Sequence, residues 1–339
     1  MRSRAIYGCA ATSLSAEEKS FFRDVQPWGF ILFARNISDA SQVIALVQEL
    51  RDTVGDAKAP VLIDQEGGRV ARLKPPHWKA RPPAATFGAL YEVNPEAARE
   101  AVYLNARLIA HDLFSLGINV DCLPVLDVPV AGAHDVIGDR AYGEAPETVA
   151  TLGRAAAEGL MAGGVLPVMK HIPGHGRAHA DSHMALPRVE ASLTELDRDF
   201  APFVANADLP MAMTSHVVYA AIDPEHPATT SRTVIRDIIR RRIGFDGLLM
   251  TDDLSMKALS GGFAERARDA LAAGCDVILH CNGDPAEMRA VAEGASPLSA
   301  EGERRAAAAM SRIAKGPESF DVEEGRARFA AACEGRWAA

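Results

Sequence analysis

Eight apolar, strand-like segments alternate with helix-like segments along almost the whole chain, and this alternation limits the fold more than any other feature. The segments span residues 5–10, 29–33, 60–65, 119–128, 165–171, 210–219, 247–254 and 275–281. Each is a continuous apolar run, as expected for parallel strands that are buried on both faces. Eight such βα units in 339 residues predict an α/β fold, a TIM-type (β/α)8 barrel.

An open, doubly wound sheet is the alternative fold. It would normally carry a glycine-rich phosphate-binding loop after an early strand, and the sequence contains none. A further helix is expected from about residue 300, followed by an acidic tail. We therefore expect residues 1–339 to form a single barrel domain.

Near the start of the chain, Ser15 and Glu18 have the spacing of a helix capping box.

Composition excludes several classes of function. The net charge of −9 argues against a nucleic-acid surface, which needs a basic stripe. A membrane span is not expected, because the sequence contains no run of about 18 apolar residues. The apolar stretch at 5–11 is too short for a secretory signal and is assigned to the first strand. Reduced thiols and a cytoplasmic location are expected because the cysteines are odd in number and scattered, at Cys9, Cys122, Cys275, Cys281 and Cys333.

The segment 170–183, KHIPGHGRAHADSH, points most directly to function. It follows a strand-like run and concentrates histidines, which exchange protons near neutral pH, in a loop containing Gly174 and Gly176. Catalytic residues often lie on loops that a rigid scaffold holds in place. A solvated, histidine-rich surface loop is the alternative, but Lys170-His171 at one end and Asp181-x-His183 at the other favour a site.

Polar residues also follow the other strand-like segments from the third onward. Active sites of TIM barrels lie at the C-terminal ends of the strands, so we expect these side chains to line one site. In chain order they are Asp64, Arg69 and Arg72; Asp127, Asp139 and Arg140; Lys170, His171, His175, His179, Asp181 and His183; Ser215 and His216; Asp252 and Asp253; His280 and Asn282.

The residue types suggest chemistry on a sugar. Asp252 ends an apolar strand and could attack an electrophilic anomeric carbon. Its alternative role is to cap the next helix, which suits Asp253 better because Asp253 is one residue closer to that helix.

Asp181 and His183 resemble a catalytic dyad, because an aspartate at one imidazole nitrogen orients the ring and raises the basicity of the other nitrogen. Donors and acceptors suited to a polyhydroxylated ligand are Asp64, Arg72, Arg140 and Lys170.

Two other reactions could use the same residues. A metal-dependent hydrolase could use His175, His179, Asp181 and His183, but these lie in a glycine-containing loop and no HExxH motif occurs. A Schiff-base aldolase could use Lys170 at a strand end, which leaves Asp252 and the Asp181–His183 pair without a role.

Three segments together resemble glycoside hydrolase family 3. They are DQEGGRVARL (64–73), KHIPGHG with DSH (170–183) and MTDDLSM (250–256). Within that family the chain is similar, over nearly its whole length, to the β-N-acetylglucosaminidases of bacterial peptidoglycan recycling. The histidine loop is the specific part of the resemblance, because family members that cleave glucosides lack it.

The resemblance implies a role for each matching position. Asp252 matches the catalytic nucleophile, His183 the histidine acid/base, and Asp181 its dyad partner. The positions that match residues holding the N-acetylglucosamine ring are Asp64, Arg72, Arg140, Lys170 and His171. Arg140 stands in RAYG, where the family has a close variant. No role follows for His175 or His179, and no metal or cofactor is expected.

The implied reaction is a retaining double displacement that removes terminal N-acetylglucosamine from muropeptide fragments. Alternatives within the class are hydrolysis of chitin oligomers and transfer of the sugar to phosphate. A non-catalytic sugar-binding barrel is the alternative from another class. We expect a cytoplasmic monomer whose partner is this small substrate, with no nucleic acid or membrane involved.

Overall fold

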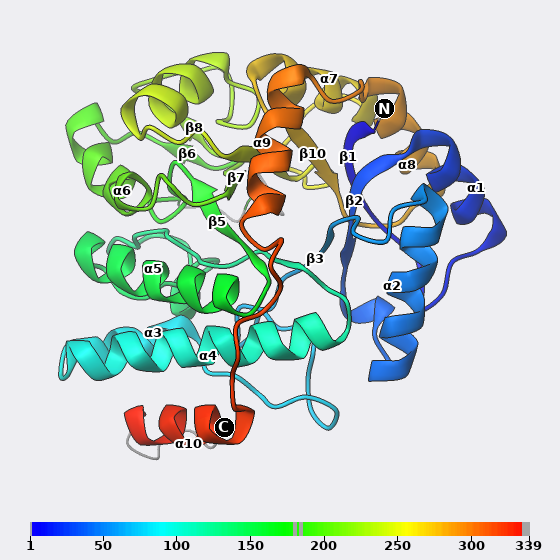
Figure 1. The fold of residues 1–339 in the computed structure, drawn as a ribbon. Coiled ribbons are helices and arrows are strands. Elements are labelled where there is room, and N and C mark those ends of the chain that lie inside the picture. Colours follow the sequence, from blue (N-terminus) through cyan, green and yellow to red (C-terminus); the bar gives the residue numbers. More distant parts are fainter. Residues whose placement is uncertain (1, 179–181, 183–185, 334–339) are drawn as a thin grey trace.

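The computed structural model describes residues 2–178, 182 and 186–333, and within them eight parallel strands form a closed barrel (Figure 1). Around the barrel the strand order is β1-β10-β9-β7-β5-β4-β3-β2. Their bounds are β1 (Ser3–Gly8), β2 (Pro27–Leu32), β3 (Val61–Ile63), β4 (Val120–Asp121), β5 (Leu166–Ile172), β7 (Met211–Thr214), β9 (Leu248–Asp253) and β10 (Val277–His280). The predicted TIM-type fold is confirmed.

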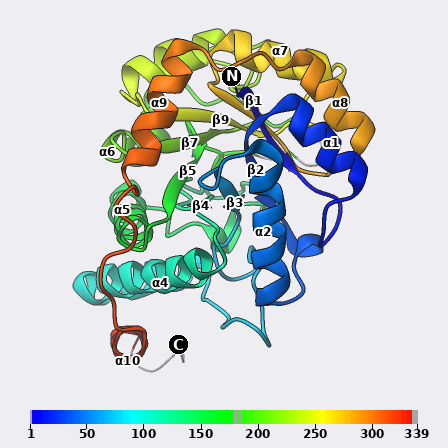
Figure 2. The same ribbon diagram turned by 45° about the vertical axis from the view of Figure 1, so that its right-hand side comes forward.

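Helices surround this barrel, as the turned view makes clear (Figure 2). They are α1 (Ala16–Val25), α2 (Ala40–Val54), α3 (Ala84–Tyr91), α4 (Pro95–Ser115), α5 (Pro146–Ala162), α6 (Leu193–Ala205), the π-helix η3 (Val234–Arg242), α7 (Phe263–Ala273), α8 (Pro285–Gly294), α9 (Ala300–Ser311) and α10 (Val322–Ala332), with short 3₁₀ turns η1 (Ala34–Asn36) and η2 (Gly138–Arg140). The capping box predicted at α1 is present: Ser15 Oγ accepts from the Glu18 backbone at 3.1 Å, and Glu18 accepts from the Ser15 backbone at 2.8 Å. Among the described helices, none has the length and apolar character needed to cross a membrane.

Some predicted boundaries are wrong. The fourth strand, expected over 119–128, is only Val120–Asp121, because Pro124 lacks the N–H that would continue the ladder. The sixth, expected over 210–219, ends at Thr214, and β8 (Val218–Tyr219) instead pairs with β6 (Arg188–Val189) in a separate two-stranded sheet. The expected acidic tail contains α10, which packs beside α4 (Figure 1).

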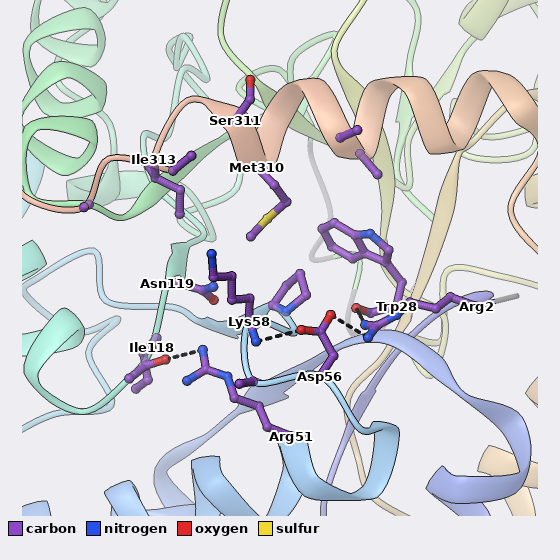
Figure 3. A pocket seen from close by; sticks show the side chains of 18 of the residues that line it. Arg2, Trp28, Arg51, Asp56, Lys58, Ile118, Asn119, Met310, Ser311 and Ile313 are labelled. Atoms are coloured by element: carbon purple, nitrogen blue, oxygen red, sulfur yellow. Dashed lines mark hydrogen bonds and ion pairs between the residues drawn. The ribbon is translucent and has the colours of Figure 1, made fainter.

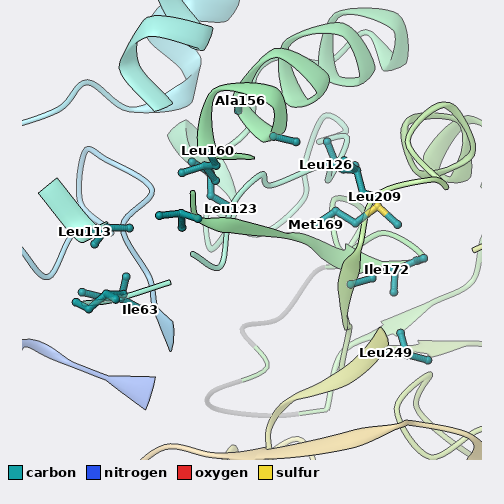
Figure 4. Packing of buried hydrophobic residues seen from close by; sticks show 14 of the residues in the cluster. Ile63, Leu113, Leu123, Leu126, Ala156, Leu160, Met169, Ile172, Leu209 and Leu249 are labelled. Carbon is teal, nitrogen blue, oxygen red and sulfur yellow. The ribbon is translucent and has the colours of Figure 1, made fainter. Parts of the chain in front are cut away.

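The core has two layers because successive strand residues point to opposite faces. Inside the barrel, Ile6, Leu62 and Leu166 belong to one buried cluster that also takes in Ala306 and Ala309 of α9. Thus α9 closes the N-terminal end of the barrel. Between strands and helices lies a second layer (Figure 4), in which Met169 and Ile172 belong to the same cluster as Leu160 of α5. The opposite end of the barrel, where the strands terminate, is left for the polar residues.

Truncating a side chain inside the barrel should destabilise the fold far more than truncating one on its surface. We expect Ile6→Ala, at a fully buried position, to lower the free energy of unfolding by about 2–5 kcal/mol through lost burial and a cavity. The matched control Ile44→Ala, 48% exposed on α2, should change it by less than about 0.5 kcal/mol. Urea denaturation measures both, and equal losses would contradict the packing described.

Candidate active site

A cavity of about 200 Å³ opens at the C-terminal ends of the strands and gathers eight of the polar residues singled out in the sequence. This volume is below that of typical drug-sized ligand sites, so it suits one sugar ring better than a long chain. Among its lining residues are Phe33, Asp64, Glu66, Arg72, Arg140, Lys170, His171, His175, Ser182, Met213, Asp252, Asp253, Met256 and Cys281.

Lys170 lies at the centre of the charged side of this cavity. Its ammonium group, almost completely buried, is 2.9 Å from Asp64 Oδ1 and 2.6 Å from Glu66 Oε1. Arg72 donates to the other oxygen of Asp64 at 3.0 Å. Arg140 makes two bonds to Glu66, at 2.8 and 2.9 Å. The resulting network joins the end of β5 to the loops after β3 and β4.

Opposite charges favour the ionised forms of Asp64, Glu66, Lys170 and Arg140. Burial alone would raise the pKa of Asp64, but the charges of Lys170 and Arg72 hold it well below its ordinary value. Burial alone would lower the pKa of Lys170, but Asp64 and Glu66 raise it above the usual range. Glu66 was missed in the sequence analysis, although it follows Asp64 by two residues and ends the same polar run.

Asp127 organises the start of the histidine loop. Its carboxylate accepts from the backbone N–H groups of His171 at 3.2 Å and His175 at 2.6 Å, and lies 2.7 Å from His171 Nδ1. Burial would raise the pKa of Asp127, but His171 and His175 lower it to about 2. His171 is thereby fixed with its ring at the cavity wall.

Asp252 enters the same cavity from the end of β9, on the seventh strand in chain order, as predicted. Its Oδ1 accepts from the backbone N–H of Asp253 at 2.8 Å. The alternative role of capping the next helix fits neither Asp252 nor Asp253, because α7 begins only at Phe263 with Gly262 before it. Asp253 instead accepts from the Ser255 hydroxyl and from the backbone of Cys281 at 3.1 Å, which ties the turn after β9 to β10.

Several predicted lining residues lie elsewhere. His216 bonds to Thr229 at 2.7 Å and to the Asp253 carbonyl at 3.0 Å, and Ser215 pairs with the Tyr219 hydroxyl. His280 points outward, where its ring meets those of Tyr7 and Phe263. The cavity lining also does not include Arg69, Asp139 or Asn282. Arg69 and Asp139 form an exposed ion pair with each other. Where β7 and β10 end, the cavity is lined instead by apolar side chains, among them Met213, Leu279 and Cys281.

His179, Asp181 and His183 lie outside the described residues, so the geometry of the predicted dyad stays a prediction. The possible metal ligands of the histidine loop include these same positions. In the part of the chain that the structure describes, no group of three or more His, Cys, Asp or Glu side chains is placed to hold a metal ion.

A larger cavity, of about 830 Å³, lies at the opposite end of the barrel (Figure 3). Met310 of α9 points into it, across from Arg51 and Asp56. Its charged groups are mostly engaged: Arg2 pairs with Asp56 at 2.6 Å, and Arg51 donates to the Gly117 carbonyl at 2.7 Å. Since TIM-barrel chemistry occurs at the C-terminal ends of the strands, the smaller cavity is the candidate active site.

Comparison with known proteins places these residues in a family context. Residues 7–315 match the family model described as the glycosyl hydrolase family 3 N terminal domain. A β-hexosaminidase from Thiobacillus denitrificans is 39% identical over 280 residues, covering 80% of this chain and 76% of the relative. A β-hexosaminidase from Methylococcus capsulatus is 40% identical over 274 residues, covering 79% and 80%.

A solved structure shares the fold over nearly the whole chain. NagZ from Neisseria gonorrhoeae, in complex with N-trifluoroacetyl-D-glucosamine, superposes with a TM-score of 0.84 at 33% identity. The match covers 98% of this chain and 96% of that one. The likeness therefore extends over both ends of the barrel.

Asp121, at the end of β4, lies beneath the charged network. Its Oδ1 accepts from the backbone of Gln65 at 2.9 Å, and its Oδ2 has no hydrogen-bond partner among the described residues. Burial raises the pKa of Asp121 from 3.8 to about 8, against a smaller lowering by the Gln65 bond. The folded protein therefore keeps this carboxyl protonated near neutral pH, whereas the unfolded chain does not.

The protonated Asp121 should make stability depend on pH. Between about pH 4 and pH 8 the folded state holds a proton that the unfolded state has lost, so this group's stabilising contribution falls as pH rises. We expect Asp121→Asn, which keeps the acceptor for Gln65, to remove a slope of up to about 1.4 kcal/mol per pH unit. Denaturant unfolding from pH 4 to 8 measures it, with the exposed Asp24→Asn as control. An unchanged slope in Asp121→Asn would contradict the assignment.

Proposed function

The chain belongs to glycosyl hydrolase family 3 and is a β-hexosaminidase, and we propose that it removes terminal N-acetylglucosamine from muropeptide fragments with retention of configuration. The observation that carries the proposal is that Asp252 shares one sugar-sized cavity with a network of charged hydrogen-bonding groups. The proposal includes a single barrel domain over residues 1–339 that acts as a monomer in the cytoplasm, where recovered cell-wall fragments are processed.

The charged network is suited to hold the sugar. Carboxylate oxygens of Asp64 can accept from sugar hydroxyls, while Arg72, Arg140 and Lys170 present donors at the same wall. His171, fixed by Asp127, adds a ring nitrogen. Because these groups already hold one another, little reorganisation is needed when a ligand replaces water, which favours tight positioning of the anomeric carbon.

Asp252 serves as the nucleophile in the first step. Its carboxylate attacks the anomeric carbon, the bond from that carbon to the leaving oxygen breaks, and His183 gives this oxygen its proton. The product of the step is a glycosyl ester on Asp252, with the aglycone released. Asp181 orients the His183 ring and stabilises its charged form.

Water completes the reaction in the second step. His183, now neutral, takes a proton from a water molecule as the water oxygen attacks the anomeric carbon. The ester bond to Asp252 breaks, and N-acetylglucosamine leaves as the β-anomer because two inversions restore the original configuration. His183 is then protonated for the next cycle, so all charges and protons balance.

The geometry also bears on the alternative reactions. A Schiff-base nucleophile must be a neutral amine, but Lys170 lies between two carboxylates that raise its pKa, so it stays charged. The small volume of the cavity favours a short substrate over a long chitin chain. Phosphorolysis remains the rival within the class, and product analysis with inorganic phosphate present separates it: N-acetylglucosamine 1-phosphate instead of free sugar would favour transfer to phosphate. A non-catalytic barrel would bind the sugar without turnover.

Removing the nucleophile should abolish the covalent route. We expect Asp252→Ala to reduce turnover of an aryl N-acetylglucosaminide by several orders of magnitude, since no ester can form. The matched control is Asp253→Asn, which changes the adjacent carboxylate and should retain much more activity. Mass spectrometry after reaction with a slow 2-deoxy-2-fluoro glycosyl inactivator should place the label on Asp252. Near-normal turnover in Asp252→Ala, or a label on Asp253, would show that the nucleophile is misassigned.

Removing the proton donor should matter most for poor leaving groups. General acid catalysis typically contributes about 10²–10⁴-fold, and an activated phenol leaves without it. We expect His183→Ala to slow unactivated glycosides by about that factor while affecting a dinitrophenyl glycoside much less. The measurement is kcat/KM across a series of aryl glycosides. Equal slowing of the whole series would remove His183 from the role of acid.

A further inference from the structure

Ser182 is held by two separate parts of the active-site rim. It is buried and lines the same cavity as Asp252. Its hydroxyl oxygen lies 3.3 Å from Nε2 of His175, and its carbonyl accepts from the backbone N–H of Ala258 at 3.2 Å. In the sequence Ser182 stands directly between Asp181 and His183.

The histidine side of this contact is itself fixed. The backbone N–H of His175 donates to the buried Asp127 at 2.6 Å, and its ring meets the His171 ring edge-on with centroids 5.7 Å apart. Burial, together with the charge of His171, lowers the pKa of His175 to about 4. His175 is therefore neutral near pH 7 and offers one donor and one acceptor nitrogen.

The other side of the contact belongs to the loop that follows the proposed nucleophile. Ala258 lies six residues after Asp252, beyond a turn in which Met256 donates to the Asp253 carbonyl at 3.1 Å. Arg266 of α7 braces this turn by donating to the Leu254 carbonyl at 2.7 Å. Ser182 thus connects the loop organised by Asp127 with the loop organised by Asp253.

We propose that His175 and Ser182 form a clasp that positions the His183 acid/base relative to the Asp252 nucleophile. The inference rests on the proposed function, since it assigns a purpose to that same dyad. Consecutive Cα atoms across a trans peptide are about 3.8 Å apart, so whatever fixes Ser182 limits where the residues bonded to it can be. Proton transfer needs such control, because a misplacement of about 1 Å can cost about 10²-fold in rate. Both clasp residues act through His183 and are positioning residues.

The test measures dependence on the leaving group in variants of the clasp. We expect Ser182→Ala to reduce kcat/KM by about 10- to 100-fold for the least activated aryl N-acetylglucosaminide and by much less for the dinitrophenyl glycoside. Ser182→Thr keeps the hydroxyl and should restore most of the loss. Ser231→Ala, which removes a buried hydroxyl bonded to Asp223 outside the cavity, is the matched control and should leave the dependence unchanged.

A double-mutant cycle tests the contact itself. His175→Phe keeps a ring but removes both nitrogens, so it should steepen the leaving-group dependence as Ser182→Ala does. The double variant should then be little worse than the worse single variant, because both changes break one interaction. Thermal unfolding shows which variants are folded. If His175→Phe is not folded, the comparison of Ser182→Ala with Ser182→Thr still tests the clasp.

The possible outcomes separate the clasp from the proposed function. Equal slowing of all substrates by Ser182→Ala, or no slowing, overturns the clasp when His183→Ala in the same series is steeply dependent on the leaving group. Failure of Ser182→Thr to restore activity also overturns it. A His183→Ala variant without leaving-group dependence overturns both the acid/base assignment and the clasp that depends on it.

Discussion

The buried ammonium of Lys170, held between Asp64 and Glu66, is the interaction on which the active-site end of the barrel depends. An unpaired charge at such a depth is costly, and removing one partner of a buried pair typically destabilises a protein by about 3–5 kcal/mol. Here each carboxylate also binds an arginine, so every member of the network has an oppositely charged partner. The network fixes the loops after β3 and β4 against β5, and so defines the wall against which a sugar can be held.

Much of this arrangement could be predicted from the sequence. Continuous apolar runs alternating with amphipathic helices are sufficient for the barrel, and the barrel brings strand ends together whatever the loops contain. For that reason the sequence predicts one site for polar residues that are far apart in the chain. Those that line the cavity as predicted include Asp64, Arg72, Arg140, Lys170, His171 and Asp252. The capping box at Ser15 is a local pattern and was equally predictable.

The rest of the site could not be predicted because it depends on which strand residues point into the barrel and which point toward the helices. Continuous apolar runs do not reveal this. Along β5, Leu166 and Val168 point into the barrel, but a shift in register after Lys170 turns Ile172 outward and brings His171 to the cavity. His280 follows the inward-pointing Leu279 and so faces the helices. Glu66 and Asp127 gain their importance from partners 104 and 44 residues away, Lys170 and His171, and no local pattern reports such pairings.

In the proposed mechanism Asp252 forms a covalent bond to the sugar, so that two inversions at the anomeric carbon leave its configuration unchanged. The most direct test is proton NMR of the products during the first minutes of hydrolysis of a GlcNAc–anhydro-muramic acid disaccharide, before the sugar mutarotates. We expect the β-anomer of N-acetylglucosamine to appear first and the α-anomer only later. Initial release of the α-anomer would mean a single displacement by water and would contradict a covalent intermediate on Asp252.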